Sequence, residues 1–161
     1  MRSASQNSSH DKSASYNPAG CNCLALRQAA RHVTQIYDQF LAPSGLRATQ
    51  YSILARLLRR GPMTINALAA DLVMDRTTLG RNIRPLQRDG LVAVVPGKSD
   101  RRSKELRLTS AGAVRVRAAR KGWDAAQARF EGAFGVKRAR RMRALLHDVV
   151  ADADGTARAS A

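Results

Sequence analysis

The chain has 161 residues and a hydrophobic content of 44%, which suits about one domain with a real core. Its formal charge of +16 and its isoelectric point near 11.5 indicate a polyanionic partner or a membrane surface rather than a neutral solute. No apolar run approaches the ~20 residues of a membrane span, no apolar signal core is visible, and few aromatic residues are present to stack on single strands. The composition therefore predicts a cytoplasmic protein that binds double-stranded DNA and no membrane.

The two ends of the chain differ in composition from its middle. Residues 1–17 are rich in Ser and Asn and have almost nothing to bury, so they are predicted to form a disordered tail, and 153–161 a flexible one. Residues 18–45 predict an N-terminal dimerisation helix, ended by Pro43 and Gly45. Its apolar face consists of Leu26, Ala30, Val33, Ile36, Tyr37, Phe40 and Leu41.

The pattern of residues 46–108 predicts a winged helix-turn-helix domain. Its first helix carries Tyr51, Ile53, Leu54, Leu57 and Leu58 and is closed by Gly61 and Pro62. A short scaffold helix follows, with Thr64 as its N-cap and an inner face of Ile65, Leu68, Ala69 and Leu72. A tight connection through Met74 and Asp75 leads to the next helix, as is typical of helix-turn-helix units.

The segment MDRTTLGRNIRPLQRDG, residues 74–90, carries the boundaries of a recognition helix. Asp75 can cap its N-terminus, and Gly90 can take the left-handed conformation that ends it. An apolar stripe of Leu79, Ile83 and Leu86 faces the core. The residues left for solvent or a ligand are Arg76, Thr77, Arg81 and Asn82. Pro85 removes a hydrogen bond to the carbonyl of Arg81 and should bend the helix there.

A basic β-hairpin is predicted directly after this helix. Its strands are Leu91 to Val95 and Lys104 to Leu108, and its tip is Lys98, Ser99, Asp100, Arg101 and Arg102. Such a pairing inserts a helix into a DNA groove and lays a wing beside it. A merely solvated turn is the alternative for the wing arginines. For Arg84 and Arg88, beyond Pro85, contact with phosphate is no better supported than simple exposure.

The pattern of residues 109–152 predicts C-terminal dimerisation helices. Thr109 caps the first, which carries Val114, Val116, Trp123 and Phe130. The second follows Gly135 and has a stripe of Met142, Leu145, Leu146, Val149 and Val150. A winged domain needs little of this extra surface, so the first and last helices are expected to pack against a second subunit in a homodimer. The basic run at 137–143 is predicted to be a solvated face rather than a second DNA site.

The succession of scaffold helix, TTLGRNIRPLQRDGLV, wing and DRRSKELRLTSAG resembles the multiple-antibiotic-resistance regulator (MarR) family of winged helix-turn-helix repressors. The resemblance covers roughly Cys23 to Val150 and is most specific at Asp100-Arg101-Arg102. It implies a mostly α fold with a small β-hairpin wing and long terminal helices at a dimer interface. It also implies that Arg102 enters the minor groove while Asp100 orients it. The recognition residues then fall on Arg76, Thr77, Thr78, Arg81 and Asn82.

Only two cysteines occur, Cys21 and Cys23, so no C-x-x-C pair and no four-ligand zinc pattern exists. Within a helix these positions lie about 200° apart, which would strain a disulfide between them. A metal site that adds His10, His32 or His147 has little support, and no cofactor is expected. Cys23 shares the stripe of Leu26 and Tyr37, near a helix start where the dipole makes a thiol a better nucleophile.

The peroxide-sensing branch of the MarR family carries a reactive cysteine at the start of its first helix, in a C-x-x-L pattern with tyrosines that hydrogen-bond the thiolate. In the alignment on Cys23 one tyrosine coincides with Tyr37, whereas the other falls on Arg27, which is a departure. Cys23 and Tyr37 would lie about 21 Å apart along one helix, so they could meet only across an antiparallel dimer. The alternative for Cys23 is a small core residue.

Relatives in the family bind small aromatic acids between the dimer helices and the winged domain, which makes Arg27, Tyr51 and Trp123 candidate ligand contacts. The sequence thus predicts a regulator, a repressor on a pseudo-palindromic operator, that is released by cysteine oxidation or by a small phenolic effector. A non-specific architectural DNA-binding protein is one alternative. A thiol enzyme is a weaker one, because no activating base stands at a suggestive spacing, and no catalytic activity is expected.

Overall fold

The computed structural model describes residues 20–97 and 103–158. The helices in these ranges are α1 (Asn22–Leu41), η2, a 3₁₀ helix (Ala42–Ser44), α2 (Ala48–Arg60), α3 (Ile65–Asp71), α4 (Arg76–Arg88), α5 (Ser110–Phe134) and α6 (Val136–Arg158). The strands are β1 (Met63–Thr64), β2 (Val92–Pro96) and β3 (Lys104–Leu108). The fold is mostly helical with a small antiparallel sheet, as the sequence predicted.

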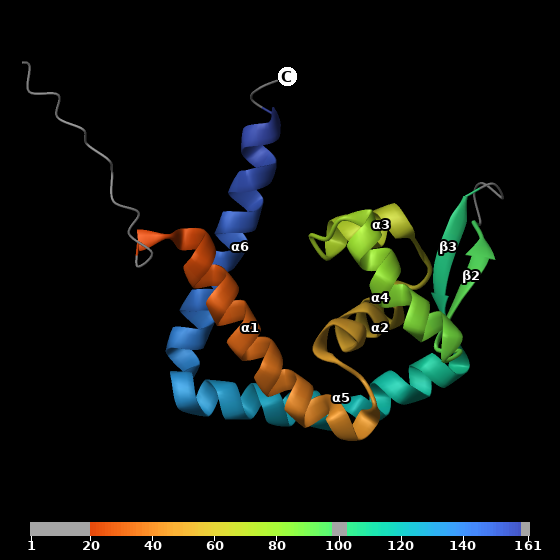
Figure 1. Cartoon of the computed structure of the whole chain (residues 1–161), viewed down its shortest axis with the longest axis horizontal. Helices are drawn as coiled ribbons and strands as arrows, with labels where there is room; N and C mark the ends of the chain where they lie inside the picture. The colour runs from red at the N-terminus through yellow and green to blue at the C-terminus, as the bar shows by residue number, and fades with distance from the viewer. Residues whose placement is uncertain (1–19, 98–102, 159–161) are drawn as a thin grey trace, which may run out of the picture.

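The long helix α5 forms the base of the molecule in Figure 1. The winged domain, from α2 to β3, sits above the N-terminal half of α5, and α6 rises from its other end. Helix α1 descends from the N-terminal side to meet the middle of α5. The backbone carbonyl of Phe40 lies so close to Gly122 that a Cβ there would be 2.5 Å from the oxygen. This close approach fixes where α1 joins the base.

Local hydrogen bonds set the helix boundaries much as expected. The hydroxyl of Thr64 accepts from the amide of Ala67 at 3.1 Å, and the carboxylate of Asp75 accepts from the amide of Thr78 at 2.8 Å. Gly90 ends α4 at a φ of 68°, in the left-handed region that suits glycine. The helix runs unbroken through Pro85, the tenth residue of α4. The turn before α4 holds Val73 at a φ of 51°, an uncommon conformation for a β-branched residue.

The sheet has the strand order β1-β3-β2, with both pairings antiparallel. Lys104 to Leu108 is a strand as predicted, and its partner is shifted by one residue to Val92–Pro96. The two-residue strand β1 was not predicted, and it places Met63 opposite Leu106 on the far side of β3. It joins the start of the helix-turn-helix to the wing.

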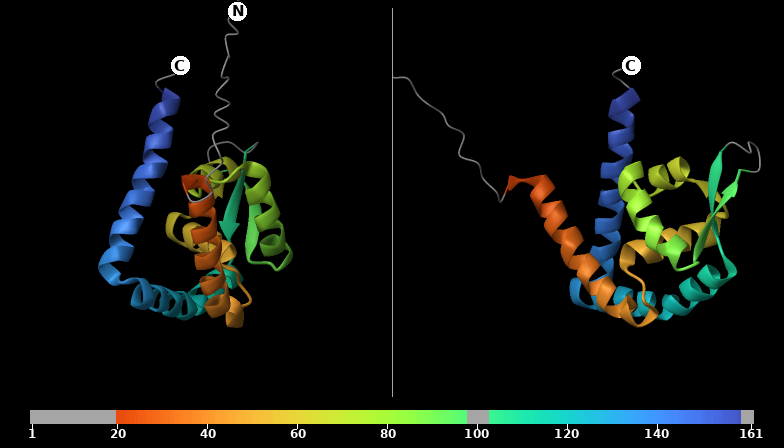
Figure 2. Two further views of the ribbon diagram at one scale, coloured as in Figure 1. Left: turned by 60° about the vertical axis from the view of Figure 1, so that its left-hand side comes forward. Right: turned by 45° about the vertical axis from the view of Figure 1, so that its right-hand side comes forward.

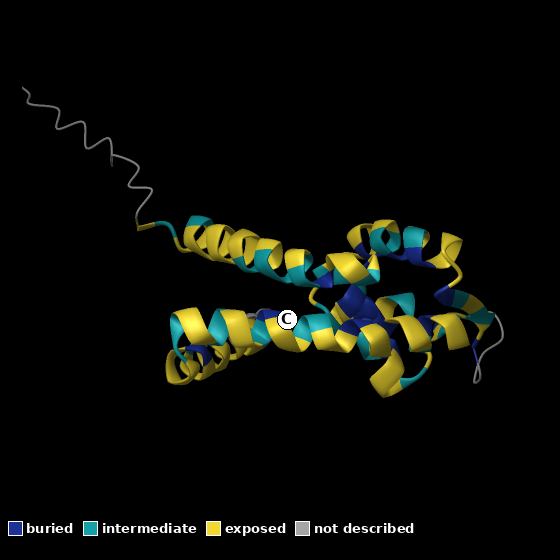
Figure 3. Ribbon diagram, turned by 90° about the horizontal axis from the view of Figure 1, so that it is seen from below, coloured by how far each residue is buried: buried dark blue, intermediate teal, exposed yellow. Residues whose placement is uncertain are grey.

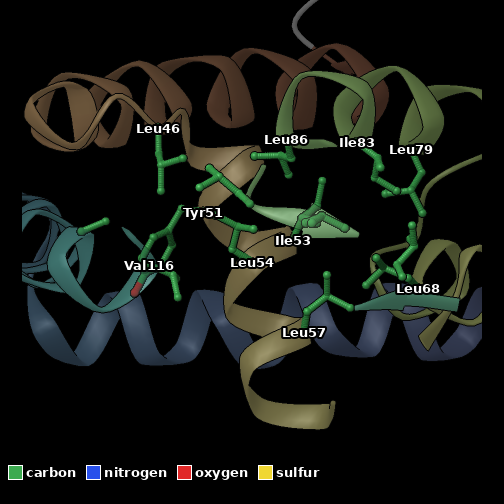
Figure 4. Close-up of a cluster of buried hydrophobic side chains, with 14 of the residues drawn as sticks. Leu46, Tyr51, Ile53, Leu54, Leu57, Leu68, Leu79, Ile83, Leu86 and Val116 are labelled. Carbon is green, nitrogen blue, oxygen red and sulfur yellow. The ribbon is translucent and has the colours of Figure 1, made fainter. Parts of the chain in front are cut away.

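The hydrophobic core lies mainly within the winged domain and extends to α5, and Figure 4 shows its side chains gathered around α2. Fully buried side chains come from α2, α3 and α4, and the N-terminal half of α5 closes the cluster from below. Its largest fully buried members are Leu41, Ile53, Leu54, Leu57, Leu68, Leu79 and Leu86. The core therefore holds the recognition helix and the base helix as one unit.

The terminal helices contribute little to this core. Leu41 is the buried residue of α1, and Ala139 is fully buried near the start of α6. Figure 3 shows both helices largely exposed. Leu26, Leu145 and Val149 are 44%, 56% and 55% exposed in the single chain. Helix α6 also continues to Arg158, so residues 153–158 of the predicted flexible tail are helical; the alanine-rich segment contains no proline to stop the helix.

Candidate nucleic-acid interface

Helix α4 is held to the rest of the domain by one buried stripe and by contacts with α2, α3 and β2. Leu79, Ile83 and Leu86 are at most 2% exposed and pack into the core. At its N-terminus, hydrogen bonds from the hydroxyl and amide of Thr78 hold the pKa of Asp75 below its usual value. The remaining face of the helix is solvent-exposed and basic. A rigid scaffold thus presents an arginine-rich helical surface.

The structure divides the five predicted recognition residues into two groups. One group, Arg76, Thr77 and Arg81, lines a hollow of about 450 Å³ together with Ile65, Gly80 and Arg84. The other group is engaged with the helix itself. The amide of Asn82 donates to the carbonyl of Thr78 at 2.9 Å, and Thr78 hydrogen-bonds Asp75. The guanidinium groups of Arg76 and Arg81 are exposed, and the side-chain amide of Asn82 keeps a second N–H that its bond to Thr78 does not use.

The C-terminal end of α4 is tied to the base helix through Thr109. Its hydroxyl lies 2.7 Å from the carbonyl oxygen of Gly90 and donates to it, and it accepts from the amide of Gly112 at 3.0 Å. The amide of Thr109 donates to the carbonyl of Leu91 at 3.1 Å. Gly112 packs directly on that same carbonyl. The recognition helix, the wing and α5 consequently meet at one joint.

The wing emerges from this joint. Strands β2 and β3 pair from Val92 opposite Leu108 to Pro96 opposite Lys104, and the amide of Gly97 donates to the carbonyl of Ser103 at 2.9 Å. The predicted tip residues Lys98, Asp100, Arg101 and Arg102 lie outside the described residues. Their proposed contact with the minor groove stays a prediction from sequence.

A second hollow, of about 340 Å³, opens between α2 and α5. Tyr51 and Trp123 form part of its wall, with their rings stacked at 19° and 6.2 Å between centroids. The guanidinium of Arg120 lies 5.2 Å from the centre of the Trp123 ring, and Arg56 and Arg59 line the same hollow. The structure brings two of the three predicted ligand contacts together. Arg27 is not among the lining residues and lies near the start of α1.

The cysteines occupy the beginning of α1. Cys21 is the N-cap residue, with a φ of −84° and a ψ of 105°, and its sulfur accepts from the amide of Leu24 at 3.4 Å. Cys23 is exposed on the first turn. Cys21 precedes the helix with extended backbone, so the expectation that both cysteines lie within a helix, where a disulfide would be strained, is wrong. Within the described residues, no group of three potential metal ligands is found.

Tyr37 lies far along the same helix and has a partner within the chain. Its hydroxyl donates to Oε1 of Gln127 on α5. Nε2 of Gln127 donates to Glu131 at 3.1 Å, and Arg143 of α6 donates to the same carboxylate at 2.8 Å. Burial and the nearby charge of Glu131 raise the pKa of Tyr37, and Arg143 offsets part of this rise. A polar network therefore joins α1, α5 and α6.

Comparison with known proteins identifies this arrangement. The profile of the MarR family matches residues 46–104. The chain is 37% identical to the Mycobacterium tuberculosis transcriptional regulator MosR in complex with DNA, over 84% of this chain and 98% of that one, with a TM-score of 0.74. The chain belongs to the MarR family. It is a winged helix-turn-helix, DNA-binding transcriptional regulator.

Two further relatives of the MarR-family chain differ in how far they match. The transcriptional activatory protein BadR of Rhodopseudomonas palustris is 33% identical over 90 residues, 54% of this chain and 51% of that protein. The chain thus spans about half the length of BadR. CouR of Rhodococcus jostii RHA1, solved with p-coumaroyl-CoA, shares the fold at 24% identity, over 84% and 96% of the two chains, with a TM-score of 0.70.

Three residues that line the hollow beside α4 were not among the predicted recognition residues of the MarR-family chain. Ile65 packs against the core as predicted and also borders the hollow, phosphate contact and simple exposure were equally supported for Arg84, and Gly80 was not considered. A glycine in the middle of a helical pattern was the available signal for Gly80.

No helix among the described residues is both long and apolar enough to cross a bilayer.

Proposed function

We propose that the chain regulates transcription in the cytoplasm by binding a pseudo-palindromic operator as a homodimer. The observation that carries this proposal is the exposed basic face of α4, held rigidly by a buried stripe, a capped N-terminus and the Thr109 joint. Two such helices from a dimer would enter successive major grooves on one side of the DNA. Support for the dimer comes from the apolar stripe of α6, which stays exposed in the single chain together with Leu26 of α1.

In this mechanism the arginines of α4 contact different parts of the DNA. Arg81 lies near the outermost line of the helix, so its guanidinium is suited to bidentate contacts with the edge of a guanine. Arg76 and Thr77, one turn earlier, are suited to phosphate or base contacts near the helix N-terminus. The solved complex of MosR with DNA supports DNA as the partner. Whether the chain represses or activates depends on where its operator lies.

The direct test is a titration of the protein against duplexes from its own upstream region and against unrelated duplexes at fixed salt. We expect Arg81→Ala to lose about 10-fold or more in affinity for the operator and much less for unrelated DNA, because a base contact is lost. The matched control is Arg140→Ala in the basic run at the start of α6, far from α4 in Figure 1. Equal affinity of the wild-type protein for all duplexes would instead support an architectural role.

A small aromatic acid is the effector that the hollow at Tyr51 and Trp123 favours. The face of the indole suits an aromatic ring, and Arg59 supplies positive charge for a carboxylate, whereas Arg56 and Arg120 are paired with Asp71 and Asp124. We expect phenolic acids to lower operator affinity of the wild-type protein and to lose this effect in Trp123→Leu. The control is Arg81→Ala, which weakens DNA binding and should keep the same affinity for the acid.

Oxidation of Cys23 is the second candidate for the signal, because this thiol is exposed at the first turn of α1. We expect peroxide to modify Cys23 before Cys21 and to reduce operator affinity, and Cys23→Ser to bind DNA normally without this response. Release of oxidised Cys23→Ser from DNA would contradict a sensor role. Consumption of more than one equivalent of peroxide per thiol would favour an enzyme over a regulator.

A further inference from the structure

Gly80 has no structural reason to be glycine within the described chain. It is the fifth residue of α4 and is not among the glycines with positive φ, so its backbone suits any residue. A Cβ placed there would have no heavy atom within 4 Å outside its own helix turn. Glycine in a helix interior lowers stability relative to alanine. The residue therefore weakens the recognition helix without relieving any internal contact.

The empty space beside Gly80 is part of the hollow between α3 and α4. Ile65 contributes from the start of α3, and the α4 side consists of Arg76, Thr77, Gly80, Arg81 and Arg84. Gly80 stands between Arg76 and Arg84 on one i, i+4, i+8 row of the helix surface. The two helices lie side by side in both views of Figure 2. A side chain at position 80 would fill the space between these arginines.

The chemistry of the hollow suits one kind of occupant. Three guanidinium groups surround it, no carboxylate lines it, and the described part of the chain offers none of the three an ion pair. Guanidinium groups bind phosphate oxygens through paired hydrogen bonds. In a helix-turn-helix unit, the helix that precedes the recognition helix crosses the DNA backbone. A phosphodiester group is thus the anion expected between α3 and α4.

We propose that this hollow seats a backbone phosphate of the operator, and that the missing side chain at Gly80 lets the DNA strand come close to the backbone of α4. The seated phosphate positions α4 in the major groove, which brings Arg81 to the base edges. Gly80 is a positioning residue in this scheme, because it makes room for the phosphate that Arg76 and Arg84 hold, while Arg81 reaches a base edge. The inference rests on the proposed function, since it requires a DNA-bound protein.

The test uses Gly80→Ala and Gly80→Leu in the full chain, with operator and unrelated duplexes over a series of salt concentrations. We expect both variants to melt about 2–4 °C higher than the wild type, because the helix gains stability. Affinity should fall for both duplexes by the same factor, about 10-fold for leucine and less for alanine. The slope of log affinity against log salt should decrease by about 1 with leucine, as one phosphate contact is lost.

Gly132→Ala in α5 is the matched control, because Gly132 is also helical and a methyl group added there would likewise meet no heavy atom within 4 Å. It should raise the melting temperature and leave DNA affinity unchanged. Unchanged affinity in both Gly80 variants would overturn the proposal. A loss confined to the operator, with the salt slope intact, would also overturn it, because a base edge would then occupy the hollow. Failure of the wild type to bind any duplex would contradict the proposed function itself.

If Gly80→Leu fails to fold, as judged by circular dichroism, Gly80→Ala decides the question. A methyl group at this position meets no atom of the chain, so its fold is preserved. A several-fold loss on both duplexes together with a higher melting temperature then supports a seated phosphate. Wild-type affinity in Gly80→Ala, with Gly132→Ala behaving alike, then counts against it.

Discussion

Asp75 is an exposed side chain whose charge is used to hold the recognition helix. Its carboxylate accepts hydrogen bonds from Thr78, and these lower its pKa in the folded protein. A carboxyl group with a lowered folded pKa stabilises the fold fully above its unfolded value of about 3.9. This contribution is lost as the pH falls through the folded pKa. Acid should therefore loosen the N-terminus of α4.

We predict that Asp75→Asn keeps the cap but loses this pH dependence. The amide oxygen of asparagine can still accept from the amide of Thr78, and it does not titrate. The free energy of unfolding, measured in urea at neutral pH and near pH 3, should fall less on acidification in the variant than in the wild type. Parallel losses in the two proteins would show that the charge of Asp75 contributes nothing.

Gly112 is a residue where packing alone requires glycine. A Cβ there would lie 2.7 Å from Cδ1 of Leu108 and still closer to the carbonyl oxygen of Leu91. We predict that Gly112→Ala destabilises the protein by about 1–3 kcal/mol, because overpacking must move the joint between α4 and α5. Denaturant unfolding measures this loss. The exposed Gly132→Ala should be stabilised in the same experiment, and equal stability of the two variants would contradict the packing argument.

The role of a single residue could be predicted from the sequence where that role depends on backbone groups two or three residues away. Thr64, Asp75 and Thr109 cap their helices as expected, because a cap depends on amides two or three residues away. Asn82 was predicted as a base reader from its position outside the buried stripe. In the structure its amide has the carbonyl of Thr78, one turn earlier, as a competing acceptor. This contact is local too, but it depends on which rotamer the Asn82 side chain adopts, and the sequence does not specify that rotamer.

At the scale of elements, the network from Tyr37 to Arg143 connects α1, α5 and α6 through polar side chains. Gln127 links the Tyr37 hydroxyl to Glu131 on α5, and Glu131 pairs with Arg143 on α6. Arg143 is thus one of the few contacts that set the direction of α6 beyond the bend at Gly135, whose φ is 94°. A substitution at Tyr37 can therefore alter the position of α6 through this chain of contacts.

We predict opposite shifts in the pKa of Tyr37 when the two charges of this network are removed. Glu131→Gln should lower the pKa, because a nearby negative charge disfavours the tyrosinate, and Arg143→Gln should raise it. Ultraviolet absorbance of tyrosinate measures both, and the chain has only three tyrosines. Tyr37→Phe assigns the transition. Shifts in the same direction would show that Tyr37 senses only its burial.

Helices and strands could be predicted where their apolar periodicity extends over many residues. The periodic stripes of α1, α2, α4 and α5 marked these helices, and Gly45, Gly61 and Gly90 marked turns that need positive φ. Strand β1 was invisible because two residues carry no alternation, and only pairing with β3 defines it. Two of the three residues predicted to contact a ligand line the same hollow. Tyr51 and Trp123 meet across α2 and α5, whereas Arg27 is kept away by the length of α1.

The whole molecule consists of a well-packed winged domain on α5 and of helical arms whose apolar residues remain exposed. Val136, Leu145, Leu146, Val149 and Val150 of α6 are between 39% and 56% exposed. Such a row of large apolar side chains on a chain with a charge of +16 indicates a surface that is covered in the assembled protein. The positive charge of each chain opposes association, so the apolar stripe must outweigh this repulsion.

We predict that Leu145→Asp converts the dimer to a monomer without unfolding the chain. Leu145 is 56% exposed in the single chain, so its replacement removes little packing there, but it would bury a charge in an apolar dimer interface. Sedimentation or light scattering should report half the mass. Operator affinity should fall by about 100-fold or more, because two half-sites are no longer bound as one unit, while affinity for an isolated half-site stays the same.

His147→Asp is the control, because it makes the same change in charge at neutral pH on another face of α6. It should remain dimeric and lose little operator affinity. A dimeric Leu145→Asp protein would place the subunit interface elsewhere. A monomer that still binds the full operator at wild-type affinity would show that one winged domain with its own charge suffices, and the spacing of two recognition helices would then have no part in recognition.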